Sequence, residues 1–408
     1  MTRVLLFTGK GGVGKTTLAA ATAAQLAADG RKALVVSTDP AHSLGDALGV
    51  PLGGQPSEVD SGLYAAQIDP RGLVDDAWRD LRGHLRTILA GAGVDELDAE
   101  ELTVLPGVEE LLALAEVHRL ATTGPWETVV VDCGPTAETL RLLALPEAFA
   151  GYLERLFPTH RRVVRGLLAG VAGTATVEKW DATADALGRL AEHLDLLRAL
   201  LADQTTTTVR LVLTPERVVA AETRRTLTAL ALQGIRVDGV VANRLVPDPG
   251  SAEGPSATWL RTRRGEQDAV LAELRQSAEL TGMGDVRVVD HRAAEPVGVQ
   301  ALLDVAAELY RGEDPLRGVE ASAAPLLEVS GGGKGTEAEY LLRIVLPLGD
   351  DVALDLARVG DELAVTVDGR RKLVALPSLL RRCVVTGAEM DETGLAVSFR
   401  PDPNLWMR

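Results

Sequence analysis

The sequence predicts an α/β protein with a mostly parallel sheet and helical insertions, followed by a small all-β sandwich domain. Apolar runs alternate with helix-forming stretches over most of the chain, which is typical of a sheet covered by helices on both faces. A small, glycine-rich and polar segment follows near 321–337, and its composition indicates a linker. The tail consists of short alternating runs separated by turn residues. We therefore expect an α/β domain over 1–320, a linker over 321–337 and a β-sandwich over 338–408.

Six apolar runs of the first domain are expected to form the strands of this sheet. Their Val and Leu content is typical of strands that are buried on both faces. The six runs cover residues 3–9, 32–40, 126–135, 208–216, 237–245 and 286–291. An alanine-rich helix should follow the first run and stop at Gly30. Longer helical stretches, near 71–123 and 146–205, exceed what a plain crossover needs and predict a helical subdomain.

The first apolar run leads into the stretch TGKGGVGKTT, residues 8–17. It contains the pattern GxxxxGK[ST] between a predicted strand and a predicted helix, the context that a phosphate-binding P-loop requires. Glycines let the backbone N–H groups surround phosphates, while Lys15 should reach the β- and γ-phosphates and the Thr16 hydroxyl should bind Mg²⁺. We therefore predict a P-loop NTPase. Its loop would bind ATP through Gly9, Lys10, Gly11, Gly12, Val13, Gly14, Lys15, Thr16 and Thr17.

The loop carries a second lysine, Lys10, five residues before Lys15. The stretch GKGGVGKT resembles the deviant phosphate loop of the ATPases that include MinD, ParA, the nitrogenase iron protein and the ArsA/tail-anchored-protein-targeting group. In that class the early lysine reaches the partner's phosphates across a dimer interface. The resemblance implies that Lys10 and Lys15 are both catalytic, with Lys10 acting like an arginine finger in a homodimer. A solvated loop lysine is the alternative.

Two further segments narrow the resemblance to the ArsA/targeting group. STDPAHSLGDALG (37–49) and DCGPTAETLRLL (132–143) resemble its switch I and switch II segments. The resemblance implies that Asp39 is catalytic by polarising the attacking water, and that Asp132 senses Mg²⁺ and the γ-phosphate, each holding Mg²⁺ through water. Both follow strand-like runs, which places them where ligands bind in open α/β sheets. An aspartate that caps a turn is the alternative for each.

Three segments resemble the nucleotide-contacting parts of this family. By that resemblance, Glu216 of TPERVVAAETRRTL touches the sugar region, and Asn243 of GVVANRL hydrogen-bonds the adenine edge. An amide suits adenine because it offers a donor and an acceptor together. HRAAEPVGVQAL lies where the adenine-flanking loop falls, which puts Glu295, Pro296 and Val297 near the base.

The tail resembles the small heat-shock (α-crystallin-like) domain of some bacterial ArsA-like proteins, through ELAVTVDGRRKLVALPSLLRR and TGLAVSFRP. No cysteine pair follows Asn243, so we expect no zinc. The two cysteines, Cys133 and Cys383, provide no thiol cluster for arsenite. The chain also has one valid phosphate loop, whereas the arsenite-pump ATPases are often tandem duplications.

Composition excludes several classes of function. A net charge of −16 argues against nucleic-acid binding, and so against a ParA-like DNA-partitioning role. No signal peptide and no run of about 18 apolar residues is found, so we expect a cytoplasmic protein that does not insert into membranes.

Two hypotheses about the function of the protein are favoured. The first is a homodimeric Mg²⁺-dependent ATPase whose hydrolysis switches a surface for a hydrophobic protein client or a membrane-protein partner. The second is a nucleotide-regulated holdase that acts through the β-sandwich, and a subunit of an arsenite pump is less favoured than both.

Overall fold

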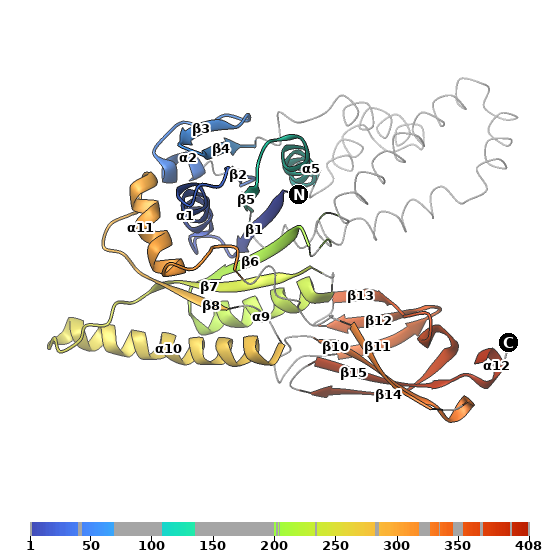
Figure 1. Ribbon diagram of the computed structural model, residues 1–408. Coiled ribbons are helices and arrows are strands. Elements are labelled where there is room, and N and C mark those ends of the chain that lie inside the picture. The colour runs from blue at the N-terminus through green and yellow to red at the C-terminus, as the bar shows by residue number, and fades with distance from the viewer. Residues whose placement is uncertain are drawn as a thin grey trace, which may run out of the picture. The chain divides into compact units, whose positions relative to one another are not determined.

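The structure is a computed structural model (Figure 1). The chain is divided into two compact units. The first unit comprises Met1–Leu5, Ala19–Thr206 and Val297–Leu302. The second unit comprises Leu6–Leu18, Thr207–Pro296 and Leu303–Arg408. The residues that the structure describes are 2–39, 43–68, 108–134, 200, 203, 205–232, 235–281, 285–317, 327–333, 335–345, 354–367, 370–391 and 394–406.

An eight-stranded sheet with strand order β3-β4-β2-β5-β1-β6-β7-β8 forms the framework of the α/β part (Figure 1). Strands β2, β5 and β6 are buried along their whole length, as expected for parallel strands covered on both faces. The predicted α/β fold class is confirmed, and each of the six predicted runs contains a strand. The eight strands are β1 (Arg3–Gly9), β2 (Ala33–Ser37), β3 (Ser57–Asp60), β4 (Leu63–Gln67), β5 (Thr128–Asp132), β6 (Thr207–Leu213), β7 (Val237–Leu245) and β8 (Val286–Asp290).

In the first unit, three parallel strands end at the same level. Strand β2 pairs with β4 on one side and with β5 on the other, so that Ser37 lies opposite both Gln67 and Asp132. Strand β3 pairs antiparallel with β4 and completes this edge of the sheet. The sequence analysis predicted neither β3 nor β4. The first unit also contains the short helix α2 (Ser43–Leu48), after β2, and the longer helix α5 (Val108–Thr123), before β5.

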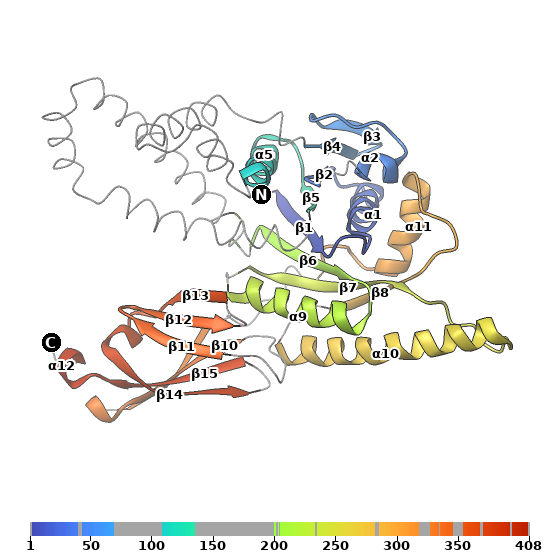
Figure 2. The same cartoon turned by 180° about the vertical axis from the view of Figure 1, so that it is seen from behind.

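The α/β portion of the second unit is built on the parallel strands β6, β7 and β8. Helices α9 (Arg217–Leu232) and α10 (Pro255–Thr281) contact each other and these strands, and they lie side by side in both views (Figures 1 and 2). They bury apolar side chains such as Leu227 and Leu271 against the sheet.

Glycines with positive φ flank two of the helices. Helix α1 (Lys15–Ala28) starts directly after the glycine loop, and Gly30 follows it with φ +85°, as the sequence analysis predicted for its end. Helix α11 (Val299–Tyr310) follows Gly298, which has φ +87°. The predicted helical stretches 71–123 and 146–205 lie outside the described residues, apart from α5 and the last few positions of the second stretch.

The tail forms two antiparallel sheets around a common apolar core. The sheets have the orders β14-β15-β10-β9 and β11-β12-β13, and Leu342, Val365, Leu395 and Phe399 are buried between them. The predicted small all-β sandwich is confirmed. Its strands are β9 (Leu327–Gly332), β10 (Glu339–Val345), β11 (Leu354–Val359), β12 (Glu362–Val367), β13 (Arg370–Ala375), β14 (Cys383–Asp391) and β15 (Gly394–Pro401), and α12 (Pro403–Trp406) follows.

The segment predicted as a linker, 321–337, differs from that expectation in its second half. Strand β9 pairs there with β10 in register, Leu342 opposite Val329. A Cβ at Gly331 would clash with the Glu339 backbone oxygen, and one at Gly333 would clash with Ala338. The glycines are therefore needed for close approach of two backbones, a use that composition alone does not distinguish from flexibility.

Candidate functional site

The phosphate loop joins β1 to α1 and has backbone geometry that requires glycine at defined positions. A Cβ at Gly9 would overlap the backbone oxygen of Val212, and a Cβ at Gly14 would overlap the side-chain amide of Asn243. Gly12 and Gly14 have φ of +78° and +93°, in the left-handed region that favours glycine. Gly11 is exposed on the same loop, and Thr16 and Thr17 lie in the first turn of α1.

Lys15 is buried in this loop with little to neutralise it. Its side chain is 5% exposed, and its one hydrogen bond among the described residues runs from Nζ to the Lys10 carbonyl oxygen at 3.4 Å. A buried ammonium group is unfavourable unless an anion or several acceptors surround it. A phosphate group provides both, so the loop fits the nucleotide that the sequence predicts.

Asn243, near the end of β7, holds the phosphate loop through a hydrogen bond from its side chain. Its Nδ2 donates to the Val13 carbonyl oxygen at 2.8 Å, and its Oδ1 accepts from the Arg244 N–H at 2.9 Å. Arg244, the next-to-last residue of β7, has φ +61°, an uncommon left-handed conformation for a residue other than glycine. One amide hydrogen and one oxygen lone pair of Asn243 remain beyond these two bonds. Its contact with adenine stays a prediction, and its bond to the loop was not foreseen.

Lys10 has a different environment from Lys15. It is half-exposed, and its Nζ lies 3.1 Å from the Glu222 carboxylate on α9, whose side chain is also half-exposed. Glu222 lies in the stretch TPERVVAAETRRTL, and the sequence alone predicted no role for it. The sequence signal for this contact was the position of the acid, about one and a half turns from the start of α9.

The predicted sugar and base contacts have partners of their own. Glu216 pairs with Arg263 of α10 at 2.7 Å, and both side chains are partly exposed. Pro296 and Val297 lie in the loop between β8 and α11 together with the exposed Glu295. Val297 is 52% exposed, and the following Gly298 N–H donates to the Ala47 carbonyl oxygen of α2 at 2.9 Å. The nucleotide roles of these residues stay predictions.

In the first unit, a hydrogen-bond relay connects the two predicted switch aspartates. The Asp39 backbone N–H donates to Ser37 Oγ at 3.2 Å, and Ser37 Oγ donates to Asp132 Oδ2 at 3.0 Å. Ser37 and Asp132 are fully buried, where such bonds are strengthened by the low local dielectric. Ser37 therefore links the Asp132 carboxylate to the backbone that carries Asp39.

Gln67 supports the same backbone from the opposite strand. Its Nε2 donates to the Asp39 carbonyl oxygen at 3.0 Å and to the Ser37 carbonyl oxygen at 3.5 Å. The sequence analysis missed Gln67 and gave Ser37 no role. A signal was present, because the run AAQIDP repeats the pattern of VVSTDP, an apolar run with a polar residue two positions before Asp-Pro.

The side-chain chemistry also fits Mg²⁺, which prefers oxygen ligands and retains several waters. Thr16 offers a hydroxyl, and Asp39 and Asp132 offer carboxylates that would act through water. The described residues contain no group of three or more His, Cys, Asp or Glu that could hold a metal by itself. The expected absence of zinc stays a prediction.

A strand, a glycine loop that excludes Cβ atoms, a buried lysine and a helix beginning at that lysine define a P-loop NTPase. Comparison with known proteins identifies the family within this class. Residues 2–311 match the ArsA family described as anion-transporting ATPase, and residues 337–399 match the HSP20-like domain found in ArsA. The chain belongs to this ATPase family and carries its HSP20-like domain, which confirms the resemblance that the sequence showed.

Three relatives illustrate the range of the family. Protein Rv2184c of Mycobacterium tuberculosis is 40% identical over 99% of this chain and 97% of its own length. A Chlorobaculum tepidum protein, named for an arsenical pump-driving ATPase, is 33% identical over 92% of this chain and 90% of its own. The ATPase get3 of Neurospora crassa is 34% identical over 60% of this chain and 73% of its own. The predicted ATPase activity is therefore supported along the α/β part of the chain.

Within the part of the chain that the structure describes, no helix is long and apolar enough to cross a membrane.

Proposed function

We propose that this ATPase hydrolyses Mg²⁺-bound ATP as a homodimer, and that hydrolysis switches a surface for a hydrophobic protein client or a membrane-protein partner. The different placement of the two loop lysines is the observation that carries the proposal. Lys15 is buried in its own loop, whereas Lys10 is half-exposed and held by a residue outside the loop. A lysine at the surface is available to the phosphates of a second copy.

The chain's own residues then divide the work of hydrolysis. Lys15 holds the phosphates in its own loop, and Lys10 of the second copy adds positive charge where the transition state spreads negative charge. Asp39 orients the attacking water, on a backbone that Ser37 and Gln67 hold in place. Bound Mg²⁺ supplies further charge neutralisation at the phosphates.

The same contacts provide a route for the switch. Asp132 occupies the end of β5, and its carboxylate is tied through Ser37 to the Asp39 backbone. By the family resemblance Asp132 senses the γ-phosphate, so loss of that phosphate would rearrange the relay at both predicted switch segments together. The rest of switch II, 135–143, lies outside the described residues.

Steady-state ATP hydrolysis measured against protein concentration tests the proposal. We expect specific activity to rise with concentration, and Lys10→Ala to abolish it while fluorescent ATP-analogue binding persists. Lys32→Ala should retain full activity, because Lys32 lies outside the phosphate loop and its ammonium group rests on the rings of Tyr64 and Trp126. Equal turnover by wild type and Lys10→Ala at every concentration would remove both the dimer and the role of Lys10.

A holdase function of the β-sandwich is the second candidate, and the edge strand β14 favours it. Val384, Val385 and Met390 are 42%, 39% and 42% exposed on this strand. Edge strands with exposed apolar side chains are available for pairing with other chains. Asp39→Asn separates the two candidates, because a holdase would still suppress the aggregation of a heated client after ATP turnover is lost.

The name of the Chlorobaculum relative raises a role in arsenical transport, which we do not favour. Cys133 and Cys383 are both buried free thiols, and they belong to separate compact units. A soft metalloid such as arsenite is bound by several exposed thiolates, and these two buried thiols do not provide such a site.

A further inference from the structure

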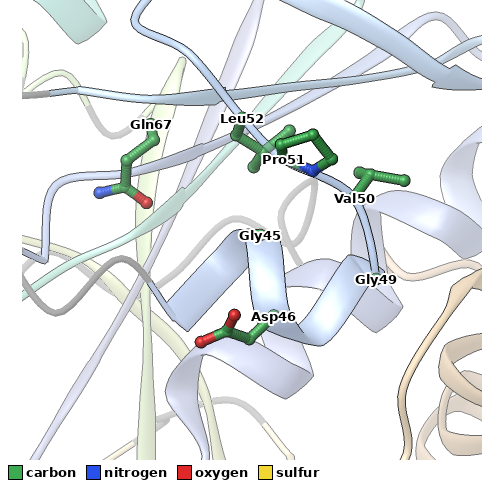
Figure 3. Close-up of a pocket in the computed structure, with 7 residues that line it drawn as sticks. All are labelled: Gly45, Asp46, Gly49, Val50, Pro51, Leu52 and Gln67. Carbon is green, nitrogen blue, oxygen red and sulfur yellow. The ribbon is translucent and has the colours of Figure 1, made fainter.

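A pocket of about 580 Å³ is lined in part by the predicted switch I segment, 37–49, and lies wholly within the first unit. It is formed by α2, by the turn 49–52 that follows this helix, and by Gln67 of β4 (Figure 3). None of the roles discussed above uses this space.

The buried end of the pocket carries an acceptor without a donor. Gln67 is 4% exposed, and its Nε2 is occupied by the Asp39 and Ser37 carbonyl oxygens. Its Oε1 is buried and has no hydrogen-bond partner among the residues that the structure describes. Figure 3 shows this oxygen on the side of the amide that faces Gly45 and Asp46, with the nitrogen on the other side. A buried acceptor without a donor costs free energy, which a ligand that donates to it would recover.

The pocket lining also includes one acid and three apolar side chains. Asp46 is exposed and has no ion pair among the residues that the structure describes. Asp46 contributes to the lining of the pocket from α2. Val50, Pro51 and Leu52 supply the apolar wall. Two oxygens beside an apolar surface match a positively charged donor on a short apolar stem.

We propose that this pocket binds an organic cation, a guanidinium or ammonium group on an aliphatic stem, which donates to Gln67 Oε1 and faces the Asp46 carboxylate. The chain's net charge of −16 favours the approach of such a ligand. The same chemistry is carried by free amines and guanidines and by the Arg or Lys side chain of a protein.

Binding would act on the Asp39 backbone through the other end of the Gln67 amide, because a hydrogen bond to Oε1 polarises the amide and strengthens its N–H donation. This consequence for hydrolysis rests on the proposed function. The binding itself does not, so the two are measured separately.

Calorimetric titration of the full chain with n-butylguanidinium, and with the neutral isostere n-butylurea, tests the site. We expect saturable binding of one n-butylguanidinium per chain and none of n-butylurea. Asp46→Asn, a surface change that should leave the fold intact, should weaken binding about two- to fivefold, and Gln67→Leu should remove it. Glu253→Gln, which neutralises an exposed acid elsewhere, should bind as wild type.

Two results would overturn the proposal: no saturable binding of n-butylguanidinium, or equal binding by wild type and Asp46→Asn. Agmatine and N-acetyl-arginine amide then distinguish the sources, since a site for a free cation prefers agmatine, whereas a site for a protein side chain accepts both. ATP turnover with and without n-butylguanidinium measures the coupling. Binding without hydrolysis in any sample would contradict the proposed function and leave the site intact.

Discussion

Arg210 and Asp238 form a fully buried ion pair between β6 and β7, and its disruption should destabilise the second unit strongly. Arg210 Nη2 and Nε donate to the two carboxylate oxygens of Asp238 at 2.8 and 3.1 Å, and both side chains are 0% exposed. Arg210 also donates to the Tyr310 hydroxyl at 2.8 Å and to the Pro315 carbonyl oxygen at 3.0 Å. One guanidinium therefore joins two strands to the end of α11 and to the turn that follows it.

Asp238→Asn would leave this guanidinium buried without a counter-charge. Burial by itself lowers the pKa of Arg210, but the Asp238 carboxylate and Tyr310 raise it by more, so the group stays charged in the folded protein. Removing one partner of a buried pair costs about 3–5 kcal/mol. Asparagine retains one acceptor oxygen in the same place, so we expect a value near the lower limit, about 3 kcal/mol.

Hydrogen–deuterium exchange of the peptides that contain β6 and β7 is the suitable assay, because a chain with several units need not unfold in one transition. A loss of about 3 kcal/mol corresponds to exchange faster by roughly two powers of ten. Asp268→Asn is the matched control, since its pair with Arg264 is partly exposed and worth about 0–1 kcal/mol. Exchange of β6 and β7 in Asp238→Asn that stays within the range of this control would refute the reasoning.

Three further outcomes are expected. Gly14→Ala should abolish binding of a fluorescent ATP analogue, because a Cβ would overlap the amide opposite and alanine disfavours φ +93°, whereas Gly11→Ala, with open space around its Cβ, should still bind. Glu222→Gln should release Lys10 and raise ATP turnover up to about fivefold at low protein concentration, and unchanged turnover would contradict a restraining role for this ion pair. Burial raises the pKa of the Cys383 thiol, an effect that Arg358 and Arg382 partly offset. As the pH rises, the thiol of the unfolded chain ionises before that of the folded protein, which favours unfolding. The contribution of Cys383 to stability is therefore complete below pH 9.0 and is lost as the pH rises through the higher folded pKa. We expect the urea midpoint to fall less between neutral and alkaline pH in Cys383→Ser than in the wild type.

The features that the sequence predicted correctly are mostly local. The phosphate loop was readable because its spacing, the strand before it and the helix after it are contiguous in the chain. Strands β2, β5 and β6 were readable because burial on both faces makes each a nearly continuous apolar run, whereas β8 was found although it is only partly buried. The sandwich strands were readable because one buried face imposes alternation of apolar and polar residues.

The features that the sequence analysis missed depend on partners far along the chain. Strand β9 looked like a linker because its glycines are defined by close approach to β10, which composition does not reveal. Gln67 and Ser37 received no role because their hydrogen bonds form only when β2, β4 and β5 end side by side. The unpaired oxygen of Gln67 is visible only after its amide nitrogen has been assigned to the Asp39 loop.

The sequence by itself thus determined the class of fold, the family and the position of the phosphate loop, because each is written in short contiguous patterns. Only the tertiary structure decided which side chains control the predicted site residues. Glu222 holds Lys10, Asn243 fastens the loop at Val13, and Gln67 supports Asp39. In each case the partner lies on another element, and a polar side chain acquires its role from the donor or acceptor that folding places within about 3 Å of it.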